Sequence, residues 1–340
     1  MTNTNQQPSE AEVKSVIALF SNGEYQQAID EIAILSKNFP KSHMLHNIKG
    51  ACYAGLGQLD SAVKFYEKAI IIKPDYAKAH FNLGGALHEL NDYEQSLKSY
   101  RKTIEIDPDY AEAHNNLGNL LREFGQLDEA INSYKNALNT KPDYLEVLYS
   151  LGLTFEELGS LDEMIEYLQL AVELEPNLVE AHNKIGQGLE KLDRFDEAIF
   201  SYQRAIEINP NFSEAYNNLG NILKECNRYD EAIIYYLKAL KITPDYPALH
   251  NNLGNAYREN GKPYEAIRSY ENALASNPDL PESHNNLGLV FFELGQLDNA
   301  LKSFKLAIKN RPSYDEAHNN LGSVFVTLNL LDEALKSFSM

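Results

Sequence analysis

Hydrophobic residues recur in residues 111–144 with the spacing of an amphipathic helix. Leu117, Leu121 and Phe124 follow one another at intervals of three or four residues, so they share one helical face. Gly125 comes directly after this pattern, and glycine tolerates the left-handed conformation that commonly follows a helix C-terminus. The pattern therefore predicts a first helix that ends just before Gly125.

A second helical pattern follows the glycine. Asp128 and Glu129 precede it, where carboxylates favour the positive end of a helix dipole. Its apolar stripe consists of Ala130, Ile131, Tyr134, Ala137 and Leu138. Pro142 prevents the helix from continuing. The segment is therefore predicted to be a helical hairpin whose apolar face must be buried against neighbouring hairpins.

The same hairpin pattern recurs along nearly the whole chain. Prolines stand at intervals of 34 residues, at Pro40, Pro74, Pro108, Pro142, Pro176, Pro210, Pro244, Pro278 and Pro312. Glycines follow the same period at Gly50, Gly84, Gly118, Gly152, Gly186, Gly220, Gly254, Gly288 and Gly322. Self-similarity at a fixed period is typical of a solenoid. We therefore expect one continuous domain over residues 9–340, preceded by a disordered segment, residues 1–8.

The repeats are numbered so that Ala111 is position 1. The predicted full repeats are 9–42, 43–76, 77–110, 111–144, 145–178, 179–212, 213–246, 247–280 and 281–314, followed by a partial repeat 315–340. Leu-Gly at positions 7 and 8, Ala at 20, Tyr or Phe at 24, Ala at 27 and Pro at 32 make the chain resemble the tetratricopeptide repeat family. The resemblance implies an all-α, right-handed superhelical solenoid that acts as a protein-binding scaffold rather than an enzyme. The first repeat departs from the pattern, with Ser15 and Val16 in place of Leu-Gly.

Composition narrows the classes of partner. The chain has 30 basic and 49 acidic residues, a formal charge of -19, which argues against nucleic acid and anionic membranes. No apolar run approaches the roughly 20 residues that span a bilayer, and the polar start resembles no secretory signal. Two cysteines, Cys52 and Cys226, are too few for a disulfide framework. These features favour a cytoplasmic protein.

Positions 2, 6, 9 and 13 of the first helix lie opposite its packing face, so they are expected to line the concave surface of a superhelix. Asparagine is the commonest residue at position 6, at Asn82, Asn116, Asn218, Asn252, Asn286 and Asn320, and position 9 adds Asn119, Asn221 and Asn255. A carboxamide can bind both a backbone C=O and a backbone N–H. This asparagine ladder therefore predicts binding of an extended polypeptide whose sequence varies. Two alternatives remain open: the asparagines bond within the scaffold, or the array is only a spacer.

The ladder also resembles the repeat arm of O-linked N-acetylglucosamine transferases. That resemblance implies substrate contacts by Asn82, Asn116, Asn218, Asn252, Asn286 and Asn320. Ser150 and Lys184 interrupt the ladder, and no glycosyltransferase domain follows Met340. The alternative function is therefore a substrate-recruiting arm whose catalytic part lies elsewhere.

The rim of the predicted groove is mainly acidic. It contains Lys184 together with Glu123, Glu225, Glu259 and Glu293. This charge favours a neutral or basic protein or peptide as the partner. Position 5 has no lysine, which argues against the carboxylate-binding mode of heat-shock-chaperone partners.

No chemistry of catalysis or cofactor binding is indicated. Seven histidines occupy position 4, one in each of seven repeats, without a second ligand at metal-binding spacing. The paired Asp-Glu residues recur at helix starts, which indicates helix capping. Leu335 and Phe338 lack a following helix. Three explanations fit these apolar residues: a truncated product, a missing downstream domain, or self-association into a homo-oligomer. The sequence does not distinguish among the three.

Overall fold

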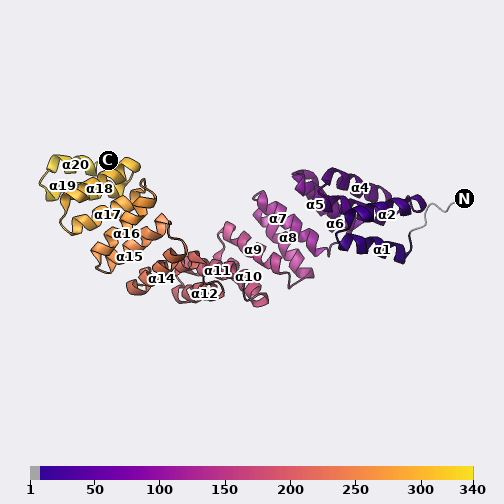
Figure 1. The fold of residues 1–340 in the computed structure, drawn as a ribbon, viewed down its shortest axis with the longest axis horizontal. Coiled ribbons are helices and arrows are strands. Elements are labelled where there is room, and N and C mark those ends of the chain that lie inside the picture. Colours follow the sequence, from indigo (N-terminus) through magenta and orange to yellow (C-terminus); the bar gives the residue numbers. More distant parts are fainter. Residues whose placement is uncertain (1–7, 340) are drawn as a thin grey trace. The chain divides into compact units, whose positions relative to one another are not determined.

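The computed structural model describes residues 8–339, and every regular element in that range is an α-helix (Figure 1). The all-α prediction is thus confirmed. The chain divides into two compact units, Met1–Leu174 and Glu175–Met340, which are described separately. Whether the array continues as one domain across that boundary stays a prediction. The predicted disorder of residues 1–7 lies outside the described residues, and Pro8 is buried.

Unit 1 consists of five helical hairpins. Its helices are α1 Glu10–Ser21, α2 Tyr25–Asn38, α3 His43–Gly55, α4 Leu59–Ile72, α5 Ala77–Glu89, α6 Tyr93–Ile106, α7 Ala111–Glu123, α8 Leu127–Thr140, α9 Leu145–Leu158 and α10 Leu161–Leu174. The odd-numbered helices are the first helices of the repeats. Direct contacts join α1 to α3, α3 to α5 and α7 to α9. First helices therefore lie beside one another and form a wall.

Unit 2 has the same arrangement. Its helices are α11 Val179–Lys191, α12 Phe195–Ile208, α13 Ser213–Glu225, α14 Tyr229–Ile242, α15 Pro247–Glu259, α16 Pro263–Ser276, α17 Pro281–Glu293, α18 Leu297–Asn310, α19 Asp315–Thr327 and α20 Leu331–Phe338. Contacts join α11 to α13, α13 to α15, α15 to α17 and α17 to α19. We call the surface formed by the first helices of each unit its first-helix wall.

The close approach of paired helices depends on the glycine at position 8. The Tyr134 ring is fully buried against Gly118, where an added Cβ would lie 2.7 Å from a ring carbon. Tyr202, Tyr236 and Tyr270 are fully buried in the same way. The periodic core of each unit is therefore a series of aromatic rings packed on helix backbone.

The turn inside each hairpin uses the left-handed conformation that the sequence predicts. Gly125 has φ +69°, and the equivalent Gly261 has φ +70°. Asn91, Asp193 and Asn227 adopt the same conformation at this position. Asn and Asp tolerate it better than other residues with a side chain, so the hairpin keeps its geometry where glycine is absent.

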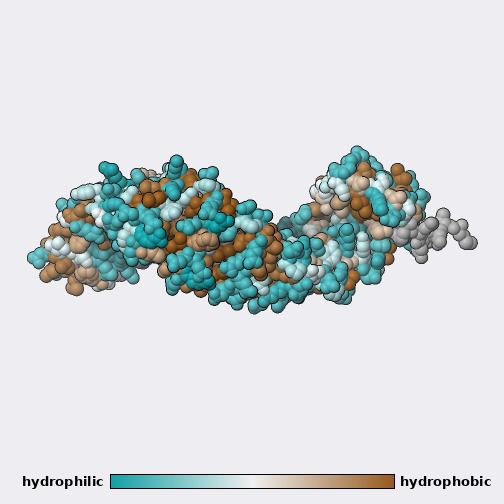
Figure 2. Space-filling view, turned by 90° about the horizontal axis from the view of Figure 1, so that it is seen from below, coloured by the Kyte–Doolittle hydropathy of each residue, from teal (hydrophilic) through white to brown (hydrophobic). Residues whose placement is uncertain are grey.

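Apolar side chains also reach the surface. Figure 2 shows apolar patches among the mainly hydrophilic residues of one face. Leu335 is 71% exposed, whereas Ile131 at the same repeat position is 7% exposed. In inner repeats the next hairpin covers this position. Phe338 of the same helix, α20, is also exposed. Among the helices of residues 8–339, none combines the length and the apolar character that a membrane span requires.

Candidate functional site

The predicted asparagines lie on the first helices of the two units and all nine are half-buried. Asn82, Asn116 and Asn119 belong to α5 and α7 of unit 1. The other six lie on α13, α15, α17 and α19 of unit 2, at Asn218, Asn221, Asn252, Asn255, Asn286 and Asn320. The structure therefore brings the predicted residues together in two groups, one on each wall.

Within unit 2, each position-6 amide bonds to the preceding repeat. Nδ2 of Asn252 donates to Oδ1 of Asn217 at 3.1 Å and to Oδ1 of Asn221 at 3.3 Å. Nδ2 of Asn286 donates to Oδ1 of Asn251 at 3.2 Å and to Oδ1 of Asn255 at 3.0 Å. The expectation that the whole carboxamide is available to a ligand is therefore corrected, because its N–H groups already join neighbouring repeats.

Three other position-6 asparagines donate one hydrogen bond each to an asparagine of the preceding repeat. Asn218 donates to Asn183 at 3.2 Å and Asn320 donates to Asn285 at 2.9 Å. In unit 1, Asn82 donates to Asn47 at 3.0 Å. The position-5 asparagines thus act as acceptors between repeats, a role that was not predicted from the sequence. Their spacing of 35 residues from the position-6 partner is the signal that was available.

The position-9 asparagines accept a different bond. Hydroxyls of buried tyrosines at position 24 donate to Oδ1 of Asn119, Asn221 and Asn255 at 2.7 Å. Burial raises the pKa of Tyr134 to about 12, so its hydroxyl stays protonated and remains a donor at neutral pH. This bond fixes the position-9 amide with its Oδ1 toward the core.

We call Asn252 with Asn221, and Asn286 with Asn255, joined asparagine pairs, and each pair has two polar groups without a hydrogen bond among residues 8–339. Within residues 8–339, no hydrogen bond reaches Oδ1 of Asn252 or Oδ1 of Asn286, and none leaves Nδ2 of Asn221 or Nδ2 of Asn255. Each joined pair therefore holds one spare acceptor and one spare donor in an ordered arrangement. Those are the two groups that a peptide unit requires.

Ser150 breaks this pattern on unit 1. Asn115, at position 5 of the preceding repeat, is 2% exposed, and its Oδ1 is buried with no hydrogen-bond partner. Its Nδ2 donates to Glu146 at 3.0 Å. In five other repeats a position-6 asparagine donates to the equivalent oxygen, but the serine side chain is shorter.

We expect Ser150→Asn to raise the stability of unit 1. The longer side chain supplies the missing donor, and an unsatisfied buried acceptor costs about 1–3 kcal/mol. Chemical denaturation should show an increase of about 1 kcal/mol. Ser150→Leu is the size-matched control without a donor, and an equal gain in that variant would contradict the explanation.

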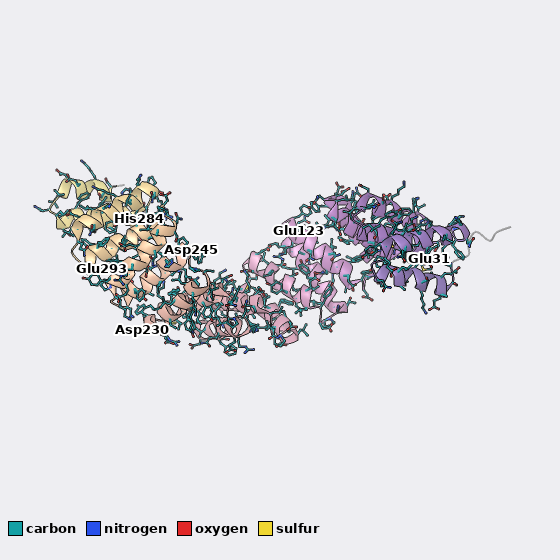
Figure 3. The ribbon with its side chains drawn as sticks, in the orientation of Figure 1. Glu31, Glu123, Asp230, Asp245, His284 and Glu293 are labelled. Atoms are coloured by element: carbon teal, nitrogen blue, oxygen red, sulfur yellow. The ribbon has the colours of Figure 1, made fainter. Side chains whose placement is uncertain are left out.

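The four rim glutamates are exposed. Two of them, Glu123 and Glu293, are labelled in Figure 3. Glu123 lies 3.6 Å from the His88 ring nitrogen, and Glu259 pairs with Arg258 at 2.8 Å. Glu225 and Glu293 have no ion-pair partner among residues 8–339. Lys184 is half-buried on α11 and interacts with other residues of the protein. The wall of unit 2 therefore carries two exposed carboxylates without an ion-pair partner among residues 8–339.

The position-4 histidines have a structural role. In all seven, Nε2 donates to the carbonyl of a proline six residues earlier, for example His114 to Pro108 at 2.9 Å and His318 to Pro312 at 2.9 Å. Each bond connects a first helix to the turn before it. Within residues 8–339, no three side chains of the metal-binding types lie together.

Protonation of two of these histidines should destabilise the protein. Burial lowers the pKa of His46 and of His182, more than the proline carbonyl raises it. The folded state therefore favours the neutral ring, and stability falls as pH drops below the unfolded value of about 6.5. We expect the urea midpoint to fall between about pH 7.5 and pH 5.5. A His46→Gln/His182→Gln variant should lose part of this pH dependence, and an unchanged slope would argue against it.

Models of protein families match several segments of the chain. A family model described as "TPR repeat" matches residues 50–91, 84–123, 118–159, 220–261, 254–295 and 288–329. Models described as "Tetratricopeptide repeat" match residues 145–178, 179–212 and 201–234. Together these matches extend over most of both units.

Individual relatives are similar over parts of the chain. A heat shock protein sti1 homolog of Schizosaccharomyces pombe is 35% identical over 77 residues, which is 23% of this chain and 13% of that protein. The structure of YrrB, described as a TPR protein with an unusual peptide-binding site, is 28% identical with a TM-score of 0.51, covering 54% of this chain and 95% of that one. A tetratricopeptide repeat protein from Parabacteroides merdae is 18% identical with a TM-score of 0.52, covering 73% and 98%. The last of these shows the fold alone.

Proposed function

The chain belongs to the tetratricopeptide repeat family, and we propose that its first-helix walls bind an extended polypeptide by its backbone. The observation that carries this proposal is the spare acceptor and spare donor of each joined asparagine pair. Asn252 and Asn286 accept from backbone N–H groups of the ligand, while Asn221 and Asn255 donate to its backbone carbonyls. The wall then recognises peptide units and tolerates many side-chain sequences.

The spacing of the repeats suits such a ligand. Packed helices lie about 8–10 Å apart, and an extended polypeptide advances about 3.3 Å per residue. Successive asparagine pairs would therefore meet roughly every third residue of the ligand. The hydrogen bonds within the scaffold help, because they hold the spare groups in place before binding and reduce the entropy lost on association.

The exposed carboxylates favour a neutral or basic ligand segment over most of the wall. Glu225 and Glu293, which lack ion-pair partners within residues 8–339, would attract lysine or arginine side chains. The peptide-binding site named for YrrB supports a peptide ligand for this family. The alternative of a substrate-recruiting arm for a glycosyltransferase makes the same use of the asparagines and rests on the resemblance in sequence.

The test uses the whole protein and a fluorescein-labelled peptide of about 18 lysine, serine and threonine residues, measured by fluorescence anisotropy. A variant with Asn221, Asn252, Asn255 and Asn286 changed to Ala should bind at least roughly tenfold more weakly, because several backbone hydrogen bonds of about 1 kcal/mol each are lost. Its helix content is checked by circular dichroism. Asn136→Ala/Asn272→Ala is the control, because both residues are exposed on second helices.

A second probe isolates the ligand backbone. The same peptide with N-methyl groups at every third residue keeps its side chains but lacks those N–H donors, and it should bind more weakly to the native protein. Binding of the unmodified peptide should also weaken with added salt, because the attraction is partly between charges. Equal binding of the peptide by the native protein and by the variant with four asparagines changed to alanine would contradict the proposal.

A further inference from the structure

The first-helix wall of unit 1 changes its chemistry at α1 and α3. Positions 6 and 9, where several later repeats carry asparagine, hold Lys14 and Ile17 on α1 and Ile48 and Ala51 on α3. Position 5 of the first repeat is Val13. Lys14 pairs with Glu10 and does not line the pocket described below, so the other positions form an apolar stretch of the wall before the asparagines of α5 and α7.

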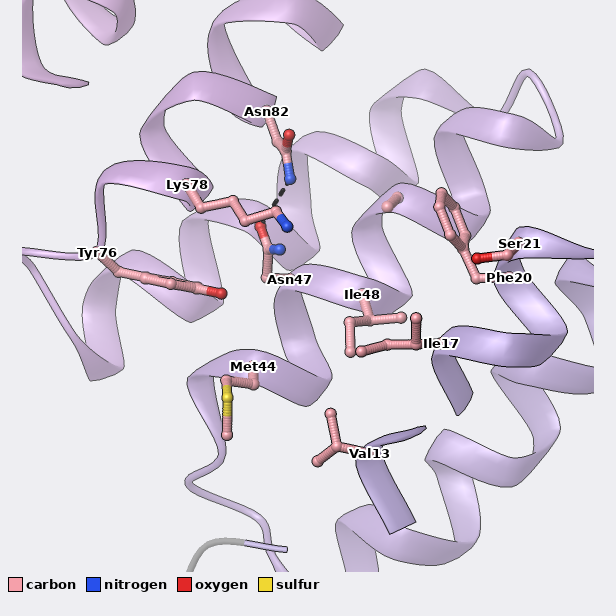
Figure 4. Close-up of a pocket in the computed structure, with 11 residues that line it drawn as sticks. Val13, Ile17, Phe20, Ser21, Met44, Asn47, Ile48, Tyr76, Lys78 and Asn82 are labelled. Carbon is pink, nitrogen blue, oxygen red and sulfur yellow. Dashed lines mark hydrogen bonds between the residues drawn. The ribbon is translucent and has the colours of Figure 1, made fainter. Parts of the chain in front are cut away.

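These residues enclose a pocket rather than a flat patch. It has a volume of about 470 Å³ and lies between α1, α3 and α5 (Figure 4). Val13 and Ile17 face Met44 and Ile48 across it, and the bonded pair Asn47 and Asn82 closes the side toward α5. Ile17 remains 45% exposed. Another hollow on unit 1, beside Asn119 and Arg122, is lined by polar and charged groups.

The rim of this pocket also differs in charge from the rest of the wall. Lys78 stands at position 2, where most later repeats carry glutamate. It is exposed, lines the pocket and has no ion-pair partner within residues 8–339. Residues 1–80 contain eight lysines and eight acidic residues, so the whole surplus of negative charge belongs to residues 81–340.

We propose that this pocket is an anchor site for two apolar side chains of an extended polypeptide, with an acidic residue of the same segment paired to Lys78. Side chains two residues apart point the same way on an extended polypeptide, about 6.6 Å from each other. A pocket of 470 Å³ can hold both, since ligand pockets range from about 300 to 1,000 Å³. The Asn82 carboxamide, whose Oδ1 receives no hydrogen bond within residues 8–339, lies beside it to accept a backbone N–H.

The inference deepens the proposed function, because it treats the pocket as the end of the same peptide-binding wall. The pocket would fix the direction in which the ligand lies on the wall, because the rest of the wall tolerates many side-chain sequences. Ligands would carry an apolar and acidic segment at the pocket, and neutral or basic residues along the rest of the wall. Specificity would then come from the pocket, and additional affinity from the asparagines.

Two labelled peptides of about 18 residues test this on the whole protein. Both have the lysine, serine and threonine background used above, and near one end one carries Leu-Thr-Leu-Glu while the other carries Ser-Thr-Ser-Glu. The leucine peptide should bind at least roughly tenfold more tightly, because the pocket removes two leucine side chains from water. Ile17→Ser should remove most of this difference. Lys78→Glu should weaken binding of both peptides, because each carries a glutamate at the pocket, and should favour a version with Lys in place of that Glu.

The outcomes separate the two proposals. If both peptides bind equally and Ile17→Ser changes nothing, the anchor site is overturned and the asparagine wall stands. If the leucine peptide depends on Ile17 but not on the four asparagines, the anchor site stands and the proposed function fails. A peptide with proline between the leucines must also bind, because proline suits an extended backbone and interrupts a helix. Loss of binding with proline would show a helical ligand and overturn the extended one.

Discussion

Replacing Gly84 by alanine is expected to destabilise unit 1 by about 2 kcal/mol, within the range of about 1–3 kcal/mol for overpacked cores. A Cβ at this position would lie 2.7 Å from a carbon of the Tyr100 ring. Tyr100 is 3% exposed and has little space to move. The helices α5 and α6 would have to separate, and urea denaturation with hydrogen exchange on these helices measures the cost.

The neighbouring glycine provides a matched control. Gly85 lies in the same helix, and an added Cβ there would find its nearest neighbour, the Tyr100 hydroxyl, at 3.9 Å. Gly85→Ala should therefore stabilise α5 by about 0.5–1 kcal/mol, because alanine loses less backbone entropy than glycine in a helix. Opposite signs at adjacent residues would tie the effect to the tyrosine ring. Destabilisation of similar size in both variants would contradict this account.

The fold could be predicted because one interaction recurs with one period. Gly118 packs against Tyr134 in the same way that Gly220 packs against Tyr236, so the packing of one repeat predicts the packing of the others. The turn at Gly125 was equally predictable, whereas the same left-handed conformation at Asn227 was not predicted from the sequence. Family models match both units, as this recurrence leads one to expect.

The hydrogen bonds between repeats could not be predicted from one repeat. Asn252 and Asn217 are 35 residues apart, and their contact depends on how one hairpin stacks on the next. The sequence indicated that the position-6 side chain points away from the hairpin core. It did not indicate that the amide nitrogen would be used by the preceding repeat. The bond from His114 to Pro108 was also not predicted, because it depends on the geometry of the turn between the two residues.

The apolar pocket was missed for a different reason. The asparagine pattern begins at Asn82, and the two repeats before it carry other residues at the equivalent positions. Ile17 and Ile48 stand at positions 9 and 6 of those repeats, which match the consensus less well. A break in a repeated pattern can thus carry as much information as the pattern, because the fold still places the substituted side chain on the same surface.

Asn252→Ala is expected to lower the stability of unit 2 by about 2 kcal/mol, as two hydrogen bonds contribute about 0.5–1.5 kcal/mol each. The substitution removes the donor from Oδ1 of Asn217 and one of two donors from Oδ1 of Asn221, which keeps its bond from Tyr236. Asn272→Ala, on the exposed face of α16, should change stability by less than about 0.5 kcal/mol. Urea denaturation compares the variants.

The loss of stability in Asn252→Ala distinguishes two states of the first-helix wall, one with fixed amides and one with amides that turn toward a ligand. If the amides are fixed by bonds between repeats, Asn252→Ala loses stability and ligand affinity together, and hydrogen exchange rises in both α13 and α15. If the amides are free to turn toward a ligand, the variant keeps its stability and loses only affinity. The bonds of 3.1 Å to Asn217 and 3.3 Å to Asn221 favour the first result. A pre-ordered wall would then bind its peptide without rearrangement, which is the condition under which weak backbone contacts add up to useful affinity.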